Sequence, residues 1–157
     1  MESSSTSRTA EKIEGPKVRQ FSIFLPNQVG ALSEVVKVLH EHSVHVLALN
    51  VQDSADSAIV RIVVSDPEQV QDLFSIHDIP FSMCDLVVVE MREGATELPK
   101  LLSALLMAEV NIHGSYGLLT RPRGNCALAF HVEDNDCASA VLRSHGFNLL
   151  SQLDISR

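Results

Sequence analysis

The chain has little of what secreted proteins and nucleic-acid-binding proteins use. Its 157 residues include no tryptophan, one tyrosine (Tyr116) and three scattered cysteines without a Cys-x-x-Cys pair. So few aromatic side chains argue against a base-stacking platform for nucleic acid. An odd number of scattered cysteines indicates reduced thiols and not a disulfide framework. We therefore expect a cytoplasmic protein.

Positive charge is scarce as well. Twelve Lys and Arg stand against 20 Asp and Glu, which gives a formal net charge of −8. Nucleic acids and anionic membranes are bound by clustered positive charge, so the composition disfavours both partners. The polar segment 1–16 has no apolar core of a secretory signal, and we expect a disordered tail there. The longest apolar run is closed by Glu109 and is too short to cross a bilayer.

Sequence signatures of enzymes and metal sites are also missing. The chain contains no GxSxG, P-loop or HExxH motif. His40, His42 and His45 are close in sequence, but no carboxylate or thiol completes a metal-ligand set at the usual spacing. We expect no catalytic residue, no metal and no cofactor, and we interpret the histidines as polar surface. Cys84 lies in an apolar strand pattern and is expected to be an inert core thiol.

What the chain does contain is a regular alternation between strand-like and helix-like periodicity. The pattern predicts strands over 18–25, 44–52, 58–65 and 81–91, a helix over 30–42, and a second helix that begins at Asp66-Pro67-Glu68. The order then repeats, with a helix around 98–105, strands over 110–120 and 126–133, a helix between 134–136 and Gly146, and a closing segment over 147–155.

The two halves align position by position. Val44 corresponds to Val110, Leu32 to Leu98, and the helix cap Asp66 to Asp134. An internal repeat indicates a duplicated unit. Each unit has the βαββαβ order of a ferredoxin-like fold, an antiparallel sheet with two helices on one face, so the class is α+β.

Almost no linker separates the two units. We expect a first domain over 17–83 and a second over 84–157, with the run 81–91 serving as the last strand of one unit and the first strand of the other. The two units should then be held rigidly together.

The third strand of the second unit carries two small residues, Ala127 and Ala129, on the face away from its helices. Such a pair suits the close approach of another sheet or another subunit. We expect a homodimer for this reason. The alternative is a plain exposed face with two alanines.

The segment from Leu25 to Leu32 joins the first strand to the first helix. A helix N-terminus offers free N–H groups and the positive end of a dipole to a carboxylate. Gly30 allows a close approach to the backbone, and the Asn27 carbonyl oxygen can accept from an ammonium group. Together these groups suit an amino acid. The alternative is an ordinary turn closed by the Asn27 side chain.

The run Leu-Pro-Asn-Gln-Val-Gly-Ala-Leu, with the following amphipathic helix and Val44-His45-Val46, resembles the ACT domain signature. The resemblance extends from Val18 to Ile155, and the layout is similar to stand-alone tandem ACT proteins of bacteria. It implies two tandem ferredoxin-like ACT domains with antiparallel sheets packed side by side, and regulation without catalysis. It also implies an amino acid bound between the first loop of one unit and the second strand of its partner.

Residue by residue, the resemblance implies two sets of ligand contacts. They are the loop positions Asn27, Gln28, Val29, Gly30, Ala31 and Leu32, and the facing strand Asn111, Ile112, His113, Gly114, Ser115 and Tyr116. The first loop of the second unit, 90–98, departs from the pattern: its glycine is displaced, Thr96 stands opposite Gly30, and acidic residues would repel a carboxylate. We expect at most one site in each chain.

The favoured function is an amino-acid-binding regulatory protein in which the ligand shifts one packing or oligomer over another. An unidentified partner protein would respond to that shift. The alternative is a ligand-free dimerisation or interaction scaffold of the same fold, and a small enzyme is a weaker third hypothesis.

Overall fold

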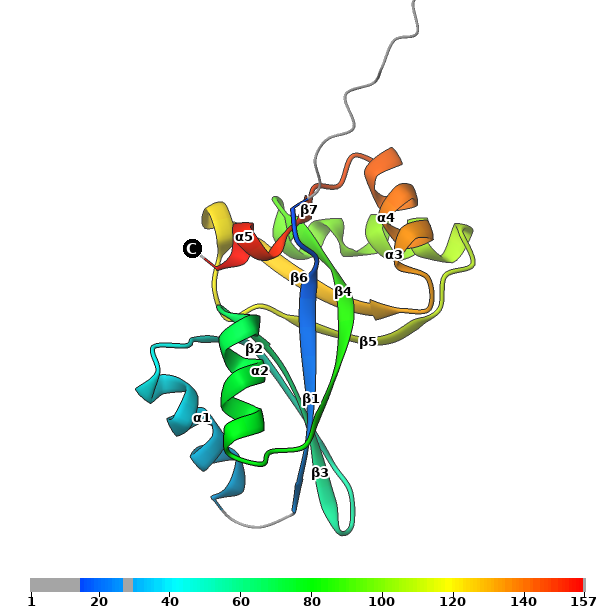
Figure 1. Cartoon of the computed structure of the whole chain (residues 1–157). Coiled ribbons are helices and arrows are strands. Elements are labelled where there is room, and N and C mark those ends of the chain that lie inside the picture. Colours follow the sequence, from blue (N-terminus) through cyan, green and yellow to red (C-terminus); the bar gives the residue numbers. More distant parts are fainter. Residues whose placement is uncertain (1–14, 27–29, 157) are drawn as a thin grey trace, which may run out of the picture.

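The computed structural model describes residues 15–26 and 30–156. The first unit contains β1 (Val18–Pro26), α1 (Ala31–Glu41), β2 (Val46–Asp53), β3 (Ser57–Val64), α2 (Pro67–Ile76) and β4 (Phe81–Met91). The second continues with the 3₁₀ helix η1 (Gly94–Glu97), α3 (Leu98–Met107), β5 (Ile112–Gly117), the 3₁₀ helix η2 (Pro122–Gly124), β6 (Cys126–Val132), α4 (Asn135–Ser144), β7 (Leu149–Leu150) and α5 (Gln152–Ile155). The predicted α+β class and the repeated βαββαβ order are confirmed (Figure 1). In the described part of the chain, no helix is long and apolar enough to span a bilayer.

Strand β4 belongs to both units, as the sequence predicts. The strand order is β2-β3-β1-β4-β6-β5, with β7 also paired to β4. Residues 81–86 of β4 pair antiparallel with β1, and residues 87–91 pair antiparallel with β6. The two sheets are thus joined by hydrogen bonds along one continuous strand, which leaves no linker about which the units can swing.

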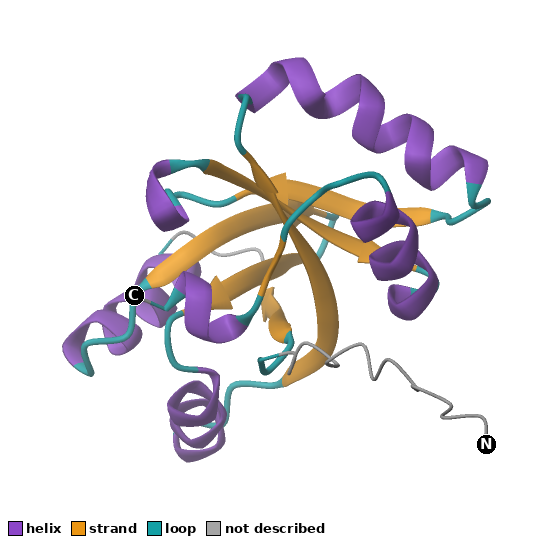
Figure 2. Cartoon of the chain, turned by 90° about the horizontal axis from the view of Figure 1, so that it is seen from above, coloured by secondary structure: helices purple, strands orange, loops and turns teal. Residues whose placement is uncertain are grey.

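Helices α1 to α4 cover only the outer face of each sheet. The strands lie in the middle of the molecule and the helices outside them (Figure 2). One core packs α1 and α2 against the first sheet, and a second packs α3 and α4 against the other. A third core, built from strands and α5, lies between the two helix-free faces. Ala127 and Ala129 belong to it, with exposures of 5% and 0%.

The cover for the alanine pair therefore comes from the other sheet of the same chain. The prediction of a closely approaching sheet is confirmed, and the alternative of an exposed face is wrong. The homodimer, for which this face was the reason, stays a prediction.

Helix boundaries follow the predicted capping residues. The carboxylate of Asp66 accepts from the N–H of Gln69 at 3.2 Å, and that of Asp134 accepts from the N–H of Cys137 at 3.0 Å. Gly146, just after α4, has a φ of +84°, the left-handed conformation that ends helices.

The closing segment differs from a full strand. β7 has two residues and is followed by α5, which starts with a capping box of Ser151 and Asp154. The reason is competition for β4: β1 is paired with β4 as far as Leu86, which leaves only its last residues for β7, and β7 pairs with Val88 and Val89.

Candidate functional site

The predicted ligand loop leads into α1 through Gly30. Asn27, Gln28 and Val29 lie outside the described residues. Gly30 has a φ of +91°, and apart from its own residue and chain neighbours no described heavy atom lies within 4 Å of the position that a Cβ would take. An added methyl group would meet open space there, although the left-handed backbone disfavours any L side chain.

Among the described residues, the first turn of α1 lacks the side-chain cap that α2, α4 and α5 have. No side chain among the described residues hydrogen-bonds to the start of α1, whereas Asp66 caps α2 and Asp134 caps α4. Helical geometry leaves the first N–H groups without intrahelical partners. Ala31 and Leu32, which carry two of these groups, are half-buried against the first core. The start of α1 can therefore offer backbone donors to an anionic group.

The equivalent loop of the second unit is closed by its own side chains. It winds into η1, where the Thr96 hydroxyl donates to the Glu93 carbonyl at 2.9 Å. The Glu97 carboxylate accepts from the Glu93 N–H at 3.1 Å. These contacts place acidic groups where a ligand carboxylate would lie, which agrees with the expectation that this loop holds no site.

The predicted facing strand does not meet the Gly30 loop within one chain. Figure 1 shows the start of α1 and β5 at separate places in the molecule. The end of β5 reaches the first sheet instead: the Tyr116 hydroxyl donates to Gln20 Oε1 at 2.7 Å, and the Leu119 N–H donates to the Leu47 carbonyl at 2.7 Å. Two halves of one ligand site could meet only between two copies of the chain.

The predicted strand residues line a different hollow, which we call the inter-sheet groove. It has a volume of about 310 Å³ and lies between the helix-free faces. The residues lining it are Asn50, Val51, Gln52, Arg61, His113, Gly114, Ser115 and Tyr116. Asn111 lies outside it and donates to the Glu133 carboxylate at 2.8 Å, and Ile112 is exposed at the start of β5.

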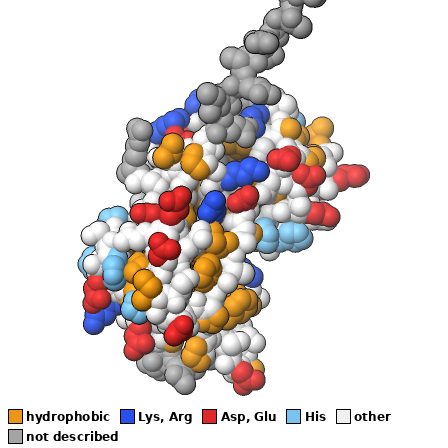
Figure 3. Space-filling model, in the orientation of Figure 1, with side chains coloured by type: hydrophobic (Ala, Val, Ile, Leu, Met, Phe, Trp, Pro, Cys, Tyr) orange, Lys and Arg blue, Asp and Glu red, His pale blue; other side chains and the backbone are white. Residues whose placement is uncertain are grey.

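Basic side chains meet at this groove. An Nη of Arg61 donates to Gln52 Oε1 at 3.1 Å, and the rings of His113 and His131 lie 5.3 Å apart. In Figure 3 histidine side chains form a group where β5 and β6 run in Figure 1. Burial lowers the pKa of His131, and His113 and Arg61 lower it further.

Sequence reasoning missed Arg61. The available signal was the alternation of β3, which places this one basic residue between Val60 and Ile62 and so on the face away from the helices.

Comparison with known proteins identifies the family. A family model described as an ACT domain pair matches residues 17–157. The chain belongs to the ACT domain pair family. No curated protein matches it.

Solved structures share the fold of this ACT domain pair. Protein BT0572 from Bacteroides thetaiotaomicron is 26% identical, with a TM-score of 0.81 and coverage of 90% of this chain and 96% of that one. The ligand-free regulatory subunit of aspartate kinase from Thermus thermophilus has a TM-score of 0.61 at 16% identity, covering 82% and 89%. The regulatory subunit of aspartate kinase from Thermus flavus has a TM-score of 0.55 at 18% identity, covering 82% and 90%.

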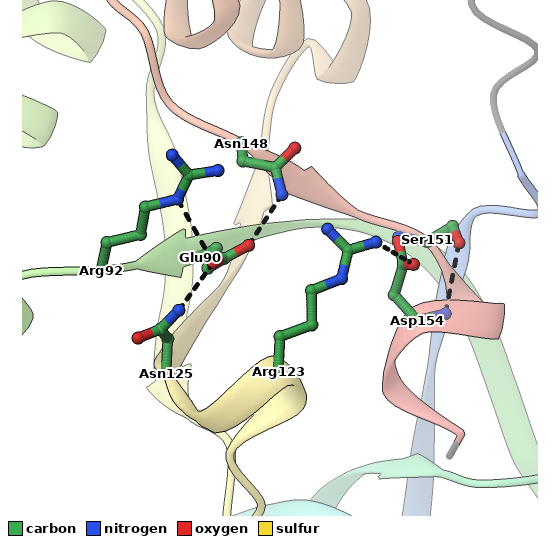
Figure 4. Close-up of polar contacts among 7 residues, drawn as sticks. All are labelled: Glu90, Arg92, Arg123, Asn125, Asn148, Ser151 and Asp154. Carbon is green, nitrogen blue, oxygen red and sulfur yellow. Dashed lines mark hydrogen bonds and ion pairs between the residues drawn. The ribbon is translucent and has the colours of Figure 1, made fainter.

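A second polar cluster of the ACT domain pair is closed to ligands. The carboxylate of Glu90, a residue only 4% exposed, accepts from Asn148 at 2.7 Å, Asn125 at 2.8 Å and Arg92 at 3.4 Å (Figure 4). Burial raises the pKa of Glu90, but these three donors together outweigh it and hold the pKa below its usual value. With both oxygens bonded, the carboxylate is a structural anchor at the end of β4.

Within the described residues, no group of three potential His, Cys, Asp or Glu ligands could hold a metal ion. Cys84 is half-buried, and burial raises its pKa, so its thiol stays protonated at neutral pH.

Proposed function

We propose that this ACT domain pair is a cytoplasmic regulatory protein that binds an amino acid at the start of α1 and catalyses no reaction. The observation that carries the proposal is the first turn of α1 behind Gly30, to which no described side chain hydrogen-bonds, together with the open space at the Cβ position of Gly30. The N–H groups and the helix dipole attract the ligand carboxylate. The carbonyl oxygen of Asn27 accepts from its ammonium group. The shared fold with aspartate kinase regulatory subunits supports this reading.

The site is completed by a second copy of the chain. Because β5 does not meet the Gly30 loop within one chain, the strand 111–116 of a partner copy supplies the other wall. The ligand then binds between two subunits and stabilises the dimer in which both walls meet. A partner protein responds to that change, whose size is limited by the difference in ligand affinity between the two states.

A thermal-shift screen of the full chain against the common amino acids tests the proposal. A ligand at a hundred times its dissociation constant adds about 2.7 kcal/mol to stability. The informative variant is Gly30→Ala, because a side chain at a φ of +91° displaces the backbone that binds the carboxylate. The matched control is Gly94→Ala, which has a similar strain at a φ of +65° in the closed loop of the second unit.

We expect a rise in the unfolding temperature of the wild type and of Gly94→Ala with the cognate amino acid, and none for Gly30→Ala. Absence of a shift with every amino acid at millimolar concentration would contradict the proposal.

One observation favours the alternative of a ligand-free scaffold. The predicted apolar stripe on α3 is only half buried: Leu101 and Leu105 are in the core, but Leu98 and Leu102 lie at the surface. The next residue in the same row, Leu106, is 78% exposed. Residues four apart share one face of a helix, so these three form an exposed apolar row. The scaffold hypothesis predicts a dimer that Leu106→Lys dissociates in light scattering, with no amino acid affecting either protein.

A further inference from the structure

We propose that the inter-sheet groove is a second binding site, which holds a compact anionic group, phosphate or carboxylate, against Arg61. This site goes beyond the proposed function, because it is formed by one chain and does not include the Gly30 loop.

Both walls of the inter-sheet groove present polar groups to the same space. On the first sheet Arg61 pairs directly with Asn50 of β2, so both side chains lie on the helix-free face. On the second sheet Gly114 pairs with His131, and the bulge next to Gly114 brings His113 beside the His131 ring. No atom lies within 4 Å of a Cβ built on Gly114, which leaves room at the centre of that wall.

The charges around the groove are unbalanced. Among the described residues no carboxylate pairs with Arg61, whose side chain bonds only to the neutral Gln52. By contrast, Arg92 and Arg123 each pair with a carboxylate. Arg61 disfavours the protonated form of His131 and so lowers its pKa, and a bound anion would offset this repulsion.

The other titratable groups at the groove add no negative charge. Burial raises the pKa of the Tyr116 hydroxyl and that of the Cys84 thiol, so both remain neutral at physiological pH. The negative charge of Asp85, the next residue of β4, also raises the pKa of Cys84. In the pairing of β4 with β1, Asp85 lies opposite the positively charged Arg19. The groove is thus locally positive in a chain whose net charge is −8.

The geometry of the donors suits an oxyanion. A guanidinium forms two parallel hydrogen bonds with phosphate or carboxylate oxygens. The Asn50 amide, half-buried and without a hydrogen-bond partner in the part of the chain described, can donate a third. Protonation of His131, whose ring lies 5.3 Å from that of His113, strengthens the attraction.

Calorimetric titration of the full chain with inorganic phosphate, glycerol phosphate and succinate tests the site at constant ionic strength. Arg61→Gln removes the positive charge. Arg61→Lys keeps the charge but cannot form the two parallel hydrogen bonds of a guanidinium. Arg19→Gln, on the exposed Arg19, makes the same net-charge change outside the groove.

We expect the wild type and Arg19→Gln to bind at least one of these anions with equal affinity, and Arg61→Gln to bind it roughly tenfold more weakly. Arg61→Lys should be intermediate, and it keeps the test informative if the Gln variant fails to fold. Binding of both phosphates but not succinate identifies a phosphate ester as the ligand class, and the reverse identifies a dicarboxylate. Sulfate, whose charge is constant near neutral pH, should bind more tightly at pH 6 than at pH 8.

Two results would overturn this inference: no binding of any probe at tens of millimolar, or equal affinity in the wild type and Arg61→Gln. The two proposals fail separately. Gly30→Ala should leave anion binding unchanged, and Arg61→Gln should leave the thermal shift by the amino acid unchanged.

Discussion

At the scale of the residue, a buried carboxylate at the end of β4 is held by a complete set of partners. The residue is Glu90, whose two carboxylate oxygens accept from Asn148, Asn125 and Arg92 (Figure 4). Those donors lie just before β7, just before β6 and just after β4. One carboxylate therefore ties together three segments of the second unit, and its loss leaves buried donors without acceptors.

Replacement of this carboxylate should be costly. We expect Glu90→Gln to lower the free energy of unfolding by about 2 kcal/mol, because the amide NH₂ faces donors and leaves at least one of them unsatisfied. Urea denaturation followed by circular dichroism measures the change. Glu93→Gln, at an exposed residue three positions along, is the matched control and should cost less than about 0.5 kcal/mol. Equal costs for both variants would contradict a structural role for Glu90.

His131 makes stability depend on pH. Burial, with His113 and Arg61, holds its pKa below the usual 6.5 in the folded chain. Just below pH 6.5 the unfolded chain therefore binds more protons than the folded chain, so the free energy of unfolding falls as the pH drops through this range. We expect His131→Asn to flatten this fall in a buffer without phosphate or carboxylate. At pH 8 the imidazole is neutral, so the difference in free energy of unfolding between the wild type and His131→Asn gives the packing cost alone. If this difference is the same at every pH, the linkage is refuted.

At the scale of the element, side-chain capping distinguishes the second helix of each unit from the first. α2 and α4 begin with an aspartate whose carboxylate accepts from the backbone, and α3 begins behind η1. α1 begins at Gly30 with no side-chain cap. The second helix of each unit thus has an aspartate cap, whereas the first helix of each unit, α1 or α3, has no side-chain cap among the described residues. The difference between the two first helices is the loop before them, which η1 closes in the second unit.

The aspartate caps should contribute similar amounts in both units. We expect Asp66→Ala and Asp134→Ala each to lower the free energy of unfolding by about 1 kcal/mol, since each removes one acceptor for a first-turn N–H group. Chemical denaturation measures both. Asp72→Ala, on the exposed surface of α2, should be nearly neutral. A cost at Asp72 as large as at Asp66 would mean that general charge, and not capping, is responsible.

At the scale of the whole molecule, the shared strand β4 and the core between the sheets make the two units one folding unit. Val18, Val88 and Ala129 come from three strands and pack in that core, so neither sheet keeps its buried face without the other. We expect a single unfolding transition in calorimetry and in circular dichroism.

Enlarging the small residues of this core should weaken the whole molecule. We expect Ala129→Leu to lower the free energy of unfolding by about 1–3 kcal/mol while the transition stays single, because Ala129 has no exposed surface and the added carbons separate the sheets. Ala140→Leu, on the exposed side of α4, is the control of equal size. Two separate transitions in the Ala129 variant would show that the units fold independently.

The sequence by itself determined the elements of this protein and their order. Strand alternation, helical stripes and capping aspartates are local properties, since they depend on residues within one or two turns of each other. The repeat, the shared strand over 81–91 and the paired alanines could therefore be predicted from the sequence. The short β7 and the exposed Leu102 could not be predicted from the sequence. Both depend on which other segment of the chain packs against the same strand edge or helix face.

Only the tertiary structure decided what faces what. The contact between Tyr116 and Gln20 joins residues 96 positions apart, and no local pattern encodes such a pairing. The sequence showed that Ala127 and Ala129 need a cover but not that the same chain provides it. Nor did it show that β5 turns toward Arg61 and away from Gly30. The path of β4 through both sheets fixes these meetings, because a hydrophobic pattern specifies the face of a strand that is buried and leaves open the surface that buries it.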